Sequence, residues 1–388
     1  MNDLVVSLYT PTVDRGRAVR TYGVVRALAA RAGTQMQPVD VLYKRFGAEV
    51  ASPLYTVLAG VSLHGVEASR GVRRGLMYAR ARAQGMPETE ARQLAPELKR
   101  EALRLASMPG RGRVIADGPA AAGMLLGLAR RRPVVYLAHN VESDLRATLR
   151  EGTESSTESE QRGDRAHARY ERRLLQSASE SWMASRADMK RARAIAPGAR
   201  LRYVPNVVDV GSISSVIPAH DRRTVLLVGD FGYTPNARAL ELLLNDVMPR
   251  VWEQLPEAEL LVAGHKLHLP VGTDPRVTGL GFVENLATVY ERASCVVVPL
   301  LEGGGSPLKF VEAMAYGLPI VATSRAAAGL EVSAGTHYVQ ADTPSELAGA
   351  LVQVLSRRDP LLGRHARALA ERHYSIEALR DLLRAEGS

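Results

Sequence analysis

Short apolar runs alternate with longer amphipathic segments along most of the chain, which is the rhythm of strands and helices in a parallel α/β sheet. In the first half, apolar runs predict strands at residues 3–10, 38–43, 113–116, 133–138 and 181–184. The rhythm returns in the second half, where strands are predicted at residues 224–229, 259–264, 277–283, 295–299 and 320–322. The pattern therefore predicts an α/β chain with two Rossmann-like sheets.

The length of the chain agrees with two domains, because 388 residues are too many for one ordinary hydrophobic core. We expect the boundary near residues 213–223, where Ser, Pro and charged residues follow one another without a clear period. The first domain then covers residues 1–210 and the second covers residues 211–372, with a last helix within 373–388.

A stretch rich in arginine interrupts the sheet rhythm between residues 51 and 108, and one or two long helices are predicted there as a basic insert. Arginines such as Arg73 and Arg80 are interleaved with Val72 and Leu76, so a helix could turn a basic face toward anionic lipid. An ordinary solvated surface is the alternative. Further along, residues 151–164 contain no apolar side chain and predict a mobile surface loop.

The most informative stretch is residues 302–322, which opens with three consecutive glycines at Gly303, Gly304 and Gly305. Glycines let a loop bring backbone N–H groups close to a ligand. Ser306 suits a helix N-cap and Pro307 suits the first helical position, so a helix is predicted from Ser306 to Gly317. Its first N–H groups and the positive end of its dipole would attract a phosphate or another anion.

Two charged residues of this predicted helix, Lys309 and Glu312, have almost entirely apolar neighbours. A buried carboxylate at Glu312 would need partners. Lys309 lies in the first turn, where the dipole disfavours a cation unless an anion binds nearby. The alternative is a flexible glycine loop followed by a surface pair between Lys309 and Glu312, which stand three residues apart.

Taken together, the glycine loop and the phrase Glu-Ala-Met-Ala-Tyr-Gly-Leu-Pro at 312–319 resemble the donor site of glycosyltransferase family four. The resemblance implies a GT-B fold, with two Rossmann-like domains facing each other across a cleft and a last helix that crosses back to the first domain. It implies that a nucleotide sugar is bound by Gly303 to Leu308 and that Glu312 holds the ribose.

The resemblance extends to other segments. His-Asn-Val-Glu at 139–142 is similar to a phrase whose His contacts the transferred sugar, which gives His139 that role; a helix cap is the alternative for this side chain. Pro-Asn-Val-Val-Asp at 205–209 is similar to the end of the first domain in the family. Further donor-site residues implied by the resemblance are Gly16 in the first domain and Asp230, Gly232, Asn236, Phe282 and Val283 in the second.

The sequence also departs from the family pattern. A second Glu that normally contacts the donor sugar is replaced by Gly304, and Glu302 stands two positions too early. The loop after residue 229 lacks the usual basic residues that hold the diphosphate. Lys309 is therefore our candidate for the missing cation, with Arg15 or Arg17 of the first domain as the alternative.

Charge and composition restrict the partners. The formal net charge is +9, and residues 1–150 carry 23 basic against 12 acidic side chains while the remainder carries 27 against 29. The first half could therefore meet an anionic acceptor or lipid surface. We expect no nucleic-acid partner, because zinc-finger and RNA-binding signatures are missing from the sequence. No apolar run is long enough for a membrane span, and no leader pattern precedes the first strand, which favours a cytoplasmic protein, either free or peripheral at the inner face of the membrane.

The sequence contains no cluster of Cys and His at metal-ligand spacing, and the single cysteine, Cys295, falls in an apolar strand pattern. The resemblance implies a retaining transfer of a sugar from a nucleotide donor to an acceptor hydroxyl, without a cofactor or metal, in glycan, glycolipid or glycosylated-metabolite biosynthesis. The acceptor could be a sugar, a lipid-linked sugar or a small molecule. A nucleotide-sugar epimerase and a non-catalytic nucleotide-sugar-binding subunit remain the alternatives.

Overall fold

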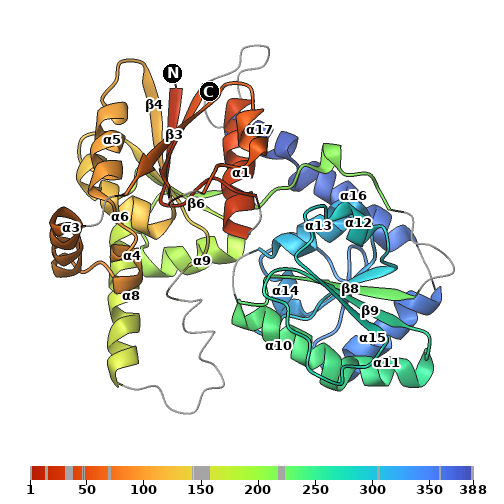
Figure 1. Ribbon diagram of the computed structural model, residues 1–388. Coiled ribbons are helices and arrows are strands. Elements are labelled where there is room, and N and C mark those ends of the chain that lie inside the picture. Colours follow the sequence, from red (N-terminus) through yellow and green to blue (C-terminus); the bar gives the residue numbers. More distant parts are fainter. Residues whose placement is uncertain are drawn as a thin grey trace. The chain divides into compact units, whose positions relative to one another are not determined.

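The computed structural model describes residues 2–13, 16–30, 38–45, 47, 49–68, 71–141, 143, 158–216, 223–303, 306–357 and 360–385, with side chains of the helix that begins at 158 described from residue 161 (Figure 1). The chain divides into two compact units. The first contains Met1–Pro205 together with Leu379–Ser388, and the second contains Asn206–Ala378. The boundaries expected from the sequence were residues 210 and 372.

The first unit is built on a seven-stranded parallel sheet with the order β3-β2-β1-β4-β5-β6-β7. Its strands are β1 (Asn2–Ser7), β2 (Val39–Arg45), β3 (Val61–Glu67), β4 (Arg111–Asp117), β5 (Val134–Leu137), β6 (Glu180–Met183) and β7 (Leu201–Tyr203). The strand order reverses between β1 and β4. This switch point is where open α/β sheets place ligand-binding loops, at the carboxyl ends of the strands.

Helices cover this sheet, as Figure 1 shows for α1, α5, α6 and α9. The helices of the first unit are α1 (Gly16–Ala29), α2 (Pro53–Thr56), α3 (Val72–Ala83), α4 (Glu88–Ala91), α5 (Pro96–Ala106), α6 (Gly118–Ala129), α8 (Glu158–Ser177) and α9 (Arg186–Ile195). The last helix of the chain, α17 (Ile376–Ala385), contributes its final turns to this unit. There the carbonyl of Leu382 accepts a hydrogen bond from Arg202, and Arg384 donates to the carbonyl of Ala30.

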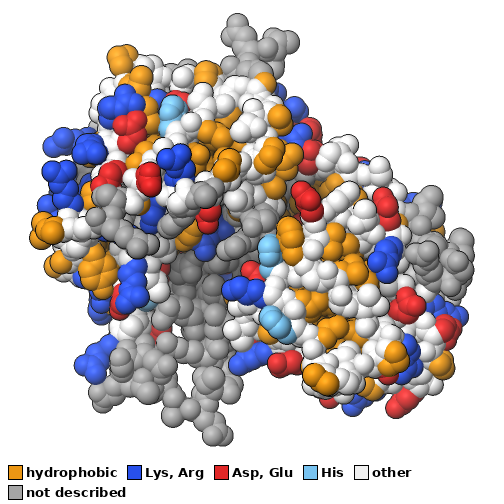
Figure 2. Space-filling model, in the orientation of Figure 1, with side chains coloured by type: hydrophobic (Ala, Val, Ile, Leu, Met, Phe, Trp, Pro, Cys, Tyr) orange, Lys and Arg blue, Asp and Glu red, His pale blue; other side chains and the backbone are white. Residues whose placement is uncertain are grey.

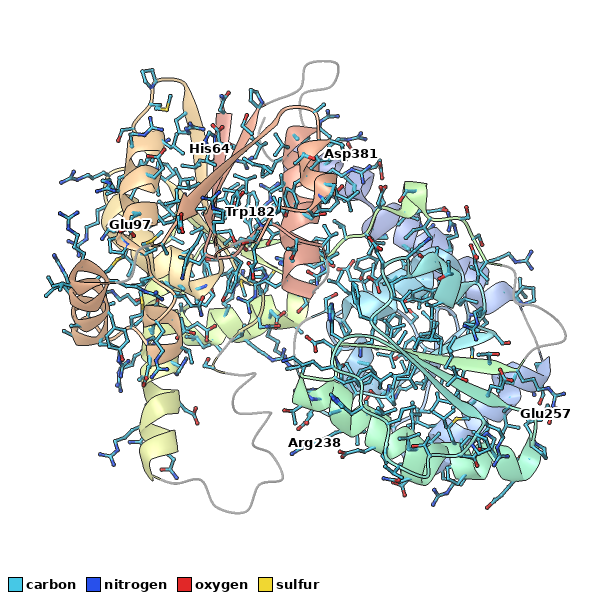
Figure 3. The ribbon with its side chains drawn as sticks, viewed as in Figure 1. His64, Glu97, Trp182, Arg238, Glu257 and Asp381 are labelled. Atoms are coloured by element: carbon cyan, nitrogen blue, oxygen red, sulfur yellow. The ribbon has the colours of Figure 1, made fainter. Side chains whose placement is uncertain are left out.

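Arg20 of α1 ties three strand ends together inside the first unit. Its guanidinium donates to the carbonyls of Ala138, Trp182 and Val204, which lie close to the carboxyl ends of β5, β6 and β7. Trp182 fills the core beside it (Figure 3). Burial lowers the pKa of Arg20 to about 10, because the low-dielectric core disfavours the charged form, although Asp117 and Asp188 oppose this shift.

The sequence prediction was wrong in part of the basic insert, because residues 51–108 are not purely helical. The run Val61–Glu67 forms edge strand β3, which pairs in parallel with β2 over its whole length. Val61 and Leu63 stand two residues apart, which is the period of a strand, and the helical prediction overlooked this short signal. After the insert, Asp117 ends β4 and Gly118 begins α6 without an intervening turn.

The expected loop at 151–164 is only partly described. Residues 151–157 lie outside the described part of the chain. Helix α8 begins at Glu158, so the prediction of a loop was wrong for residues 158–164, which are helical. The helix persists because its later turns bury Tyr170 and Leu174 against the first core.

The second unit repeats the architecture with a six-stranded parallel sheet in the order β10-β9-β8-β11-β12-β13. Its strands are β8 (Thr224–Val228), β9 (Glu259–Ala263), β10 (Val277–Gly281), β11 (Cys295–Val298), β12 (Ile320–Ala322) and β13 (Val339–Gln340). Alternate residues of β8 enter two cores, Leu226 on one face of the sheet and Leu227 on the other. Both faces are therefore covered by helices, which explains the continuous apolar strands.

The helices of the second unit are α10 (Thr234–Leu242), α11 (Met248–Gln254), α12 (Ala287–Tyr290), α13 (Leu308–Tyr316), α14 (Ser324–Ala327), α15 (Pro344–Arg357) and α16 (Pro360–His373). A π-helical turn at Leu243–Val247 joins α10 to α11, so residues 234–254 form one continuous helical segment with a bulge. None of the helices formed by the described residues has the length and apolar character needed to span a membrane.

A close backbone approach fixes the carboxyl ends of β8 and β9. Gly264 follows β9 with φ +145°, and a Cβ atom at this position would lie 1.7 Å from the carbonyl oxygen of Gly229, which follows β8. The N–H of Gly264 donates to the carbonyl of Gly281, and the N–H of Gly229 donates to that of Ala263. Only glycine fits at residue 264, because any side chain would push two neighbouring strands apart.

Gly264→Ala is therefore expected to lower the free energy of unfolding by at least about 3 kcal/mol, since it adds a backbone clash to an unfavourable φ. Gly272→Ala is the matched control: its φ is +82°, but a Cβ there meets no atom within 4 Å. That variant should lose only about 1–2 kcal/mol. Urea unfolding of both proteins checks the difference, and equal losses would show that the close approach contributes nothing.

Candidate functional site

The candidate site lies at the switch point of the second sheet, where the strand order reverses between β8 and β11. The loop after β8 leads into α10, and the glycine-containing loop after β11 leads into α13. Both helices therefore begin at the carboxyl edge of the sheet, with their N-termini at the ends of neighbouring strands. Unpaired N–H groups of such helix ends form a favourable environment for an anion.

Lys309 of α13 and Asn236 of α10 join these two helices. The ammonium of Lys309 donates to Asn236 Oδ1 at 2.6 Å, and Asn236 Nδ2 donates to the carbonyl of Asp230 at 2.8 Å. A Cβ atom on Gly229 would lie 3.0 Å from Asn236 and 3.3 Å from the Lys309 ammonium, so the glycine leaves the room that both side chains occupy. The sequence placed all of Asp230, Asn236 and Lys309 in the site, and the structure brings them together.

Lys309 holds a charge that its surroundings satisfy only in part. An ammonium has three N–H donors, and Asn236 is the one partner that the described residues provide. Burial lowers the pKa of Lys309 to about 8, against an opposing attraction from Glu312. An anion bound beside the ammonium would supply the missing acceptors and restore its pKa toward the ordinary range.

Glu312 lies one turn further along α13 and accepts a hydrogen bond from the hydroxyl of Tyr290 at 3.3 Å. Burial raises the pKa of the Glu312 carboxyl, although the Tyr290 hydrogen bond and the charge of Lys309 oppose the shift. Tyr290 is itself fixed by stacking on Tyr316, with ring centroids 4.1 Å apart. The contacts of the described residues do not include the alternative ion pair between Lys309 and Glu312, because each side chain has another partner.

The start of α13 corrects the sequence prediction. The helix begins at Leu308 with Pro307 as its N-cap, so Ser306 is not the cap and Pro307 is not the first helical residue. The hydroxyl of Ser306 is buried without a partner among the described residues, while its carbonyl accepts from Asn206 Nδ2 at 2.7 Å. The N-cap residue Pro307 provides no side-chain hydrogen bond to the first turn of α13. Gly317, with φ 72°, ends the helix as predicted.

The glycine loop is held from outside by residues that the sequence did not reveal. Glu302 is buried and pairs with Arg238 of α10 at 2.7 Å (Arg238 is labelled in Figure 3). Arg325 donates to the carbonyl of Gly303 at 2.9 Å, and Gly303 has φ 103°. The other two predicted loop residues, Gly304 and Gly305, lie outside the described part of the chain.

The remaining predicted residues of the second unit line the ends of β8, β9 and β10. Asp230 accepts from the N–H of Gly232, and the side chain of Lys266 lies close over Gly232. Phe282 is exposed and stacks on the ring of His265, with centroids 4.2 Å apart, whereas Val283 packs against the core. Tyr290, Arg238 and Lys266 were missed because their sequence neighbours give no motif; only the fold brings them to this edge.

The two predicted residues of the first unit lie near its own switch point. Gly16 is the first residue of α1, and His139 follows β5. His139 Nε2 lies 2.8 Å from Asp117 Oδ1 at the end of β4, and Asp117 also accepts from the hydroxyls of Ser7 and Thr21. This contact differs from the helix cap considered from the sequence. Asp117 was missed, although an acidic residue at a strand end before Gly-Pro was a usable signal.

Burial and hydrogen bonding together indicate which of His139 and Asp117 carries the shared proton. Burial opposes ionisation of Asp117, but His139 and the two hydroxyls together hold its pKa below the ordinary value. Burial lowers the pKa of His139, with Asp117 opposing and Arg17 and Arg20 contributing. The neutral ring therefore donates its Nε2 proton to the carboxylate. Its Nδ1 has no partner among the described residues and is left as an acceptor for a hydroxyl.

A metal centre is not formed by the described residues, since no three His, Cys, Asp or Glu side chains among them are grouped to hold an ion. Cys295 is buried within β11, and burial raises the pKa of its thiol to about 12.

Comparison with known proteins agrees with this fold. Residues 222–357 match the family model described as glycosyl transferases group 1. No curated protein sequence matches the chain. Sucrose-phosphate synthase from Thermosynechococcus elongatus is similar over 99% of this chain and 97% of its own, with a TM-score of 0.73 and 17% identity.

Two further solved structures are similar over nearly the whole chain. The HepE protein of Anabaena in complex with UDP-glucose covers 100% of this chain and 98% of its own, at a TM-score of 0.66 and 15% identity. WaaG, described as a glycosyltransferase involved in lipopolysaccharide biosynthesis, covers 99% and 100%, at a TM-score of 0.64 and 15% identity. The predicted fold class is confirmed: two parallel-sheet α/β domains of the GT-B type.

The ring of His139 is expected to be neutral at pH 7. In nitrogen-15 NMR spectra at pH 7, one ring nitrogen of His139 should be protonated and the other not, with a titration midpoint below 6.5. Asp117→Asn should lower the midpoint further, because the carboxylate that favours the imidazolium is removed. The spectrum of His139→Asn identifies the resonances, and a wild-type midpoint above 6.5 would contradict the neutral assignment.

Proposed function

We propose that this protein is a retaining glycosyltransferase that moves a sugar from a nucleotide-sugar donor to an acceptor hydroxyl. The observation that carries the proposal is the ammonium of Lys309, which has one hydrogen-bond acceptor among the described residues and lies at the switch point of the second sheet, in the first turn of α13. The match of residues 222–357 to group 1 glycosyltransferases supports it independently. UDP-glucose, the ligand named for HepE, supports a nucleotide-sugar donor.

The donor diphosphate is assigned to Lys309 and to the first N–H groups of α13. Both carry positive charge or partial positive charge at one edge of the sheet. Among the described residues Lys309 has one acceptor, Asn236, and the N–H groups of Phe310 and Val311 share the carbonyl of Pro307. During transfer the bond between the anomeric carbon and the donor phosphate oxygen breaks, so negative charge grows on the leaving diphosphate. A cation already in place stabilises this charge without reorganisation, which contributes to lowering the barrier.

The ribose is assigned to Glu312. Its carboxylate has one hydrogen bond from Tyr290 and further lone pairs to accept from ribose hydroxyls. Tyr290 fixes one carboxylate oxygen, so the orientation of the group is set before the nucleotide binds. The nucleotide base is assigned to the segment just after β10, where the resemblance implies contacts from the backbone of Phe282 and Val283 and where the exposed ring of Phe282 offers an aromatic face.

In the first unit, His139 Nδ1 is assigned to a hydroxyl of the transferred sugar. The neutral ring accepts a hydrogen bond there, while Asp117 fixes its tautomer through Nε2. The acceptor oxygen forms the new bond to the anomeric carbon on the face that the diphosphate leaves, and the acceptor proton passes to the departing phosphate. Lys309 and the helix N–H groups replace a metal ion in this scheme, so activity should persist in a chelator.

Glu312→Gln tests the nucleotide site. The variant keeps the shape of the side chain but loses the charge that strengthens hydrogen bonds from ribose hydroxyls, so the dissociation constant for UDP-glucose should rise at least about tenfold. Isothermal calorimetry measures the affinity, with UDP, GDP and ADP as further ligands if UDP-glucose does not bind. The matched control is Glu253→Gln on the exposed side of α11, which makes the same charge change and should bind normally.

Two outcomes would redirect the proposal. Unchanged affinity in Glu312→Gln would remove the ribose assignment. Wild-type protein that binds a nucleotide sugar but releases neither nucleotide nor product with any acceptor would identify a binding subunit rather than a transferase.

Lys309→Met tests the diphosphate cation. Turnover should fall at least about tenfold, because the variant removes the charge while keeping length. The free energy of unfolding should not fall, since burial of this ammonium already costs stability below its lowered pKa. In the wild type, donor affinity should weaken as the pH rises above about 8, where Lys309 loses its proton, and Lys309→Met should lack this dependence.

Lys266→Met is the control, because this second lysine lies beside Gly232 at the same sheet edge. Normal turnover in Lys309→Met together with a tenfold loss in Lys266→Met would transfer the role to Lys266. Normal turnover in both would leave the cation to an arginine of the first unit, Arg17 or Arg15, of which Arg15 lies outside the described residues.

A further inference from the structure

Helix α3 of the first unit is exposed on nearly every side. Ala81 is its one buried residue, and Met77 and Tyr78 pack partly against the first core. Arg74 fixes the helix by donating to the carbonyl of Arg92. These residues define the inner side of α3, and Figure 1 shows the helix at the periphery of its unit.

The outer side of α3 has an apolar centre. Val72 and Leu76 are 80% and 66% exposed, and their four-residue spacing places them on one face of the helix. Ala79 and Ala83 continue this face by the same period. Arginines flank it on both sides, Arg73 and Arg80 along one edge and Arg82 along the other, and the helix contains no acidic residue.

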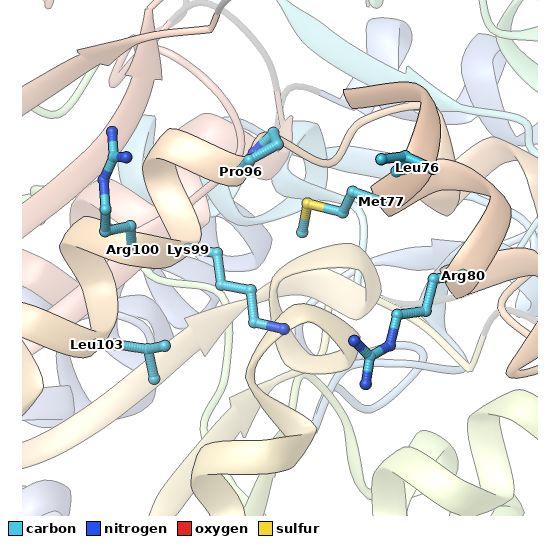
Figure 4. A pocket seen from close by; sticks show the side chains of 7 residues that line it. All are labelled: Leu76, Met77, Arg80, Pro96, Lys99, Arg100 and Leu103. Atoms are coloured by element: carbon cyan, nitrogen blue, oxygen red, sulfur yellow. The ribbon is translucent and has the colours of Figure 1, made fainter. Parts of the chain in front are cut away.

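A groove of about 470 Å³ continues this surface between α3 and α5 (Figure 4). Its floor is apolar and consists of Leu76, Met77, Pro96 and Leu103. Its rim is basic and consists of Arg80, Lys99 and Arg100. In Figure 2, hydrophobic and basic side chains lie together over this edge of the first unit. We call the outer side of α3 and this groove the α3–α5 surface.

The chemistry of the α3–α5 surface selects its ligand. A solvated helix face would place polar residues at its centre, whereas this one places Val72 and Leu76 there and arginines at the margins. That order is the arrangement of a helix that lies in a membrane interface, with apolar side chains among acyl chains and guanidinium groups at the phosphates. Nucleic acid would engage the arginines but would leave the apolar centre in water.

Charge complementarity identifies the kind of membrane. Residues 71–108 carry eight basic and four acidic side chains. Two of the acids are paired within their own helical segments, Glu88 with Arg92 and Glu101 with Arg104. The net charge that faces outward is therefore positive. We propose that the α3–α5 surface docks the first unit on a bilayer that contains anionic lipid, with α3 in the interface and an acyl chain or headgroup phosphate at the groove. The proposal does not depend on the donor site.

Flotation of the full chain with vesicles tests this surface. Vesicles of phosphatidylcholine alone are compared with vesicles that contain about 30% phosphatidylglycerol, at about 0.05 M and 0.5 M salt. We expect binding to anionic vesicles at low salt, at least about tenfold weaker binding to neutral ones, and a clear loss at high salt.

Two variants separate the charged and apolar parts of the surface. Arg73→Gln with Arg80→Gln should weaken binding about 25-fold, at about fivefold for each basic side chain near the lipid surface. Val72→Gln with Leu76→Gln should weaken it at least about tenfold at unchanged charge. All four side chains are exposed, so thermal melting should be close to that of the wild type, which confirms that the variants fold.

Matched controls lie elsewhere on the chain. Arg130→Gln with Arg131→Gln removes two exposed arginines at the end of α6, and Val271→Gln removes a fully exposed apolar side chain of the second unit. These proteins should bind like the wild type. The proposal is overturned by equal binding to neutral vesicles, by no binding to either kind, or by controls that weaken binding as much as the α3 variants do. Binding of RNA that is lost with the arginines while vesicle binding is absent would indicate a nucleic-acid surface.

Discussion

The candidate site of the second unit is centred on an ammonium group, that of Lys309, held at a sheet edge with too few hydrogen-bond acceptors. Lys309 reaches Asn236, and this contact ties α13 to α10 across the ends of β11 and β8. The geometry is possible only because Gly229 leaves space beside both side chains and Gly264 lets β9 approach β8. Burial destabilises the charged form of the amine and therefore lowers its pKa. The fold therefore maintains an unfavourable charge at the place where α/β sheets bind ligands.

Arg20 shows that the same fold can bury a cation without leaving it short of acceptors. Its guanidinium donates to three carbonyls near strand ends of the first unit, and these hydrogen bonds join β5, β6 and β7. Lys309 has one neutral partner among the described residues. Both cations are buried, but they differ in the number of hydrogen-bond acceptors around them. A buried cation with enough acceptors is structural, whereas one with too few can bind an anion.

The sequence predicted what depends on short-range pattern. Apolar runs located most strands of both sheets, because strands covered on both faces are continuously hydrophobic. Strand β3 was missed because it is an edge strand with partly exposed alternation inside a basic stretch. The N-cap of α13 was placed one residue early, because serine is a favoured cap residue, but the Ser306 hydroxyl is buried instead. Short-range preferences alone do not decide between two adjacent caps.

The contacts that give the site its chemistry lie further apart in sequence. Lys309 meets Asn236 across 73 residues, Arg238 meets Glu302 across 64, and Tyr290 meets Glu312 across 22. The motif named Lys309 and Glu312 but assigned them to each other or to a ligand, whereas the fold gives each a separate partner. This separation matters, because a direct ion pair would neutralise both groups. With distinct partners, a cation and a carboxylate on one helix stay available for a phosphate and a ribose of the same nucleotide.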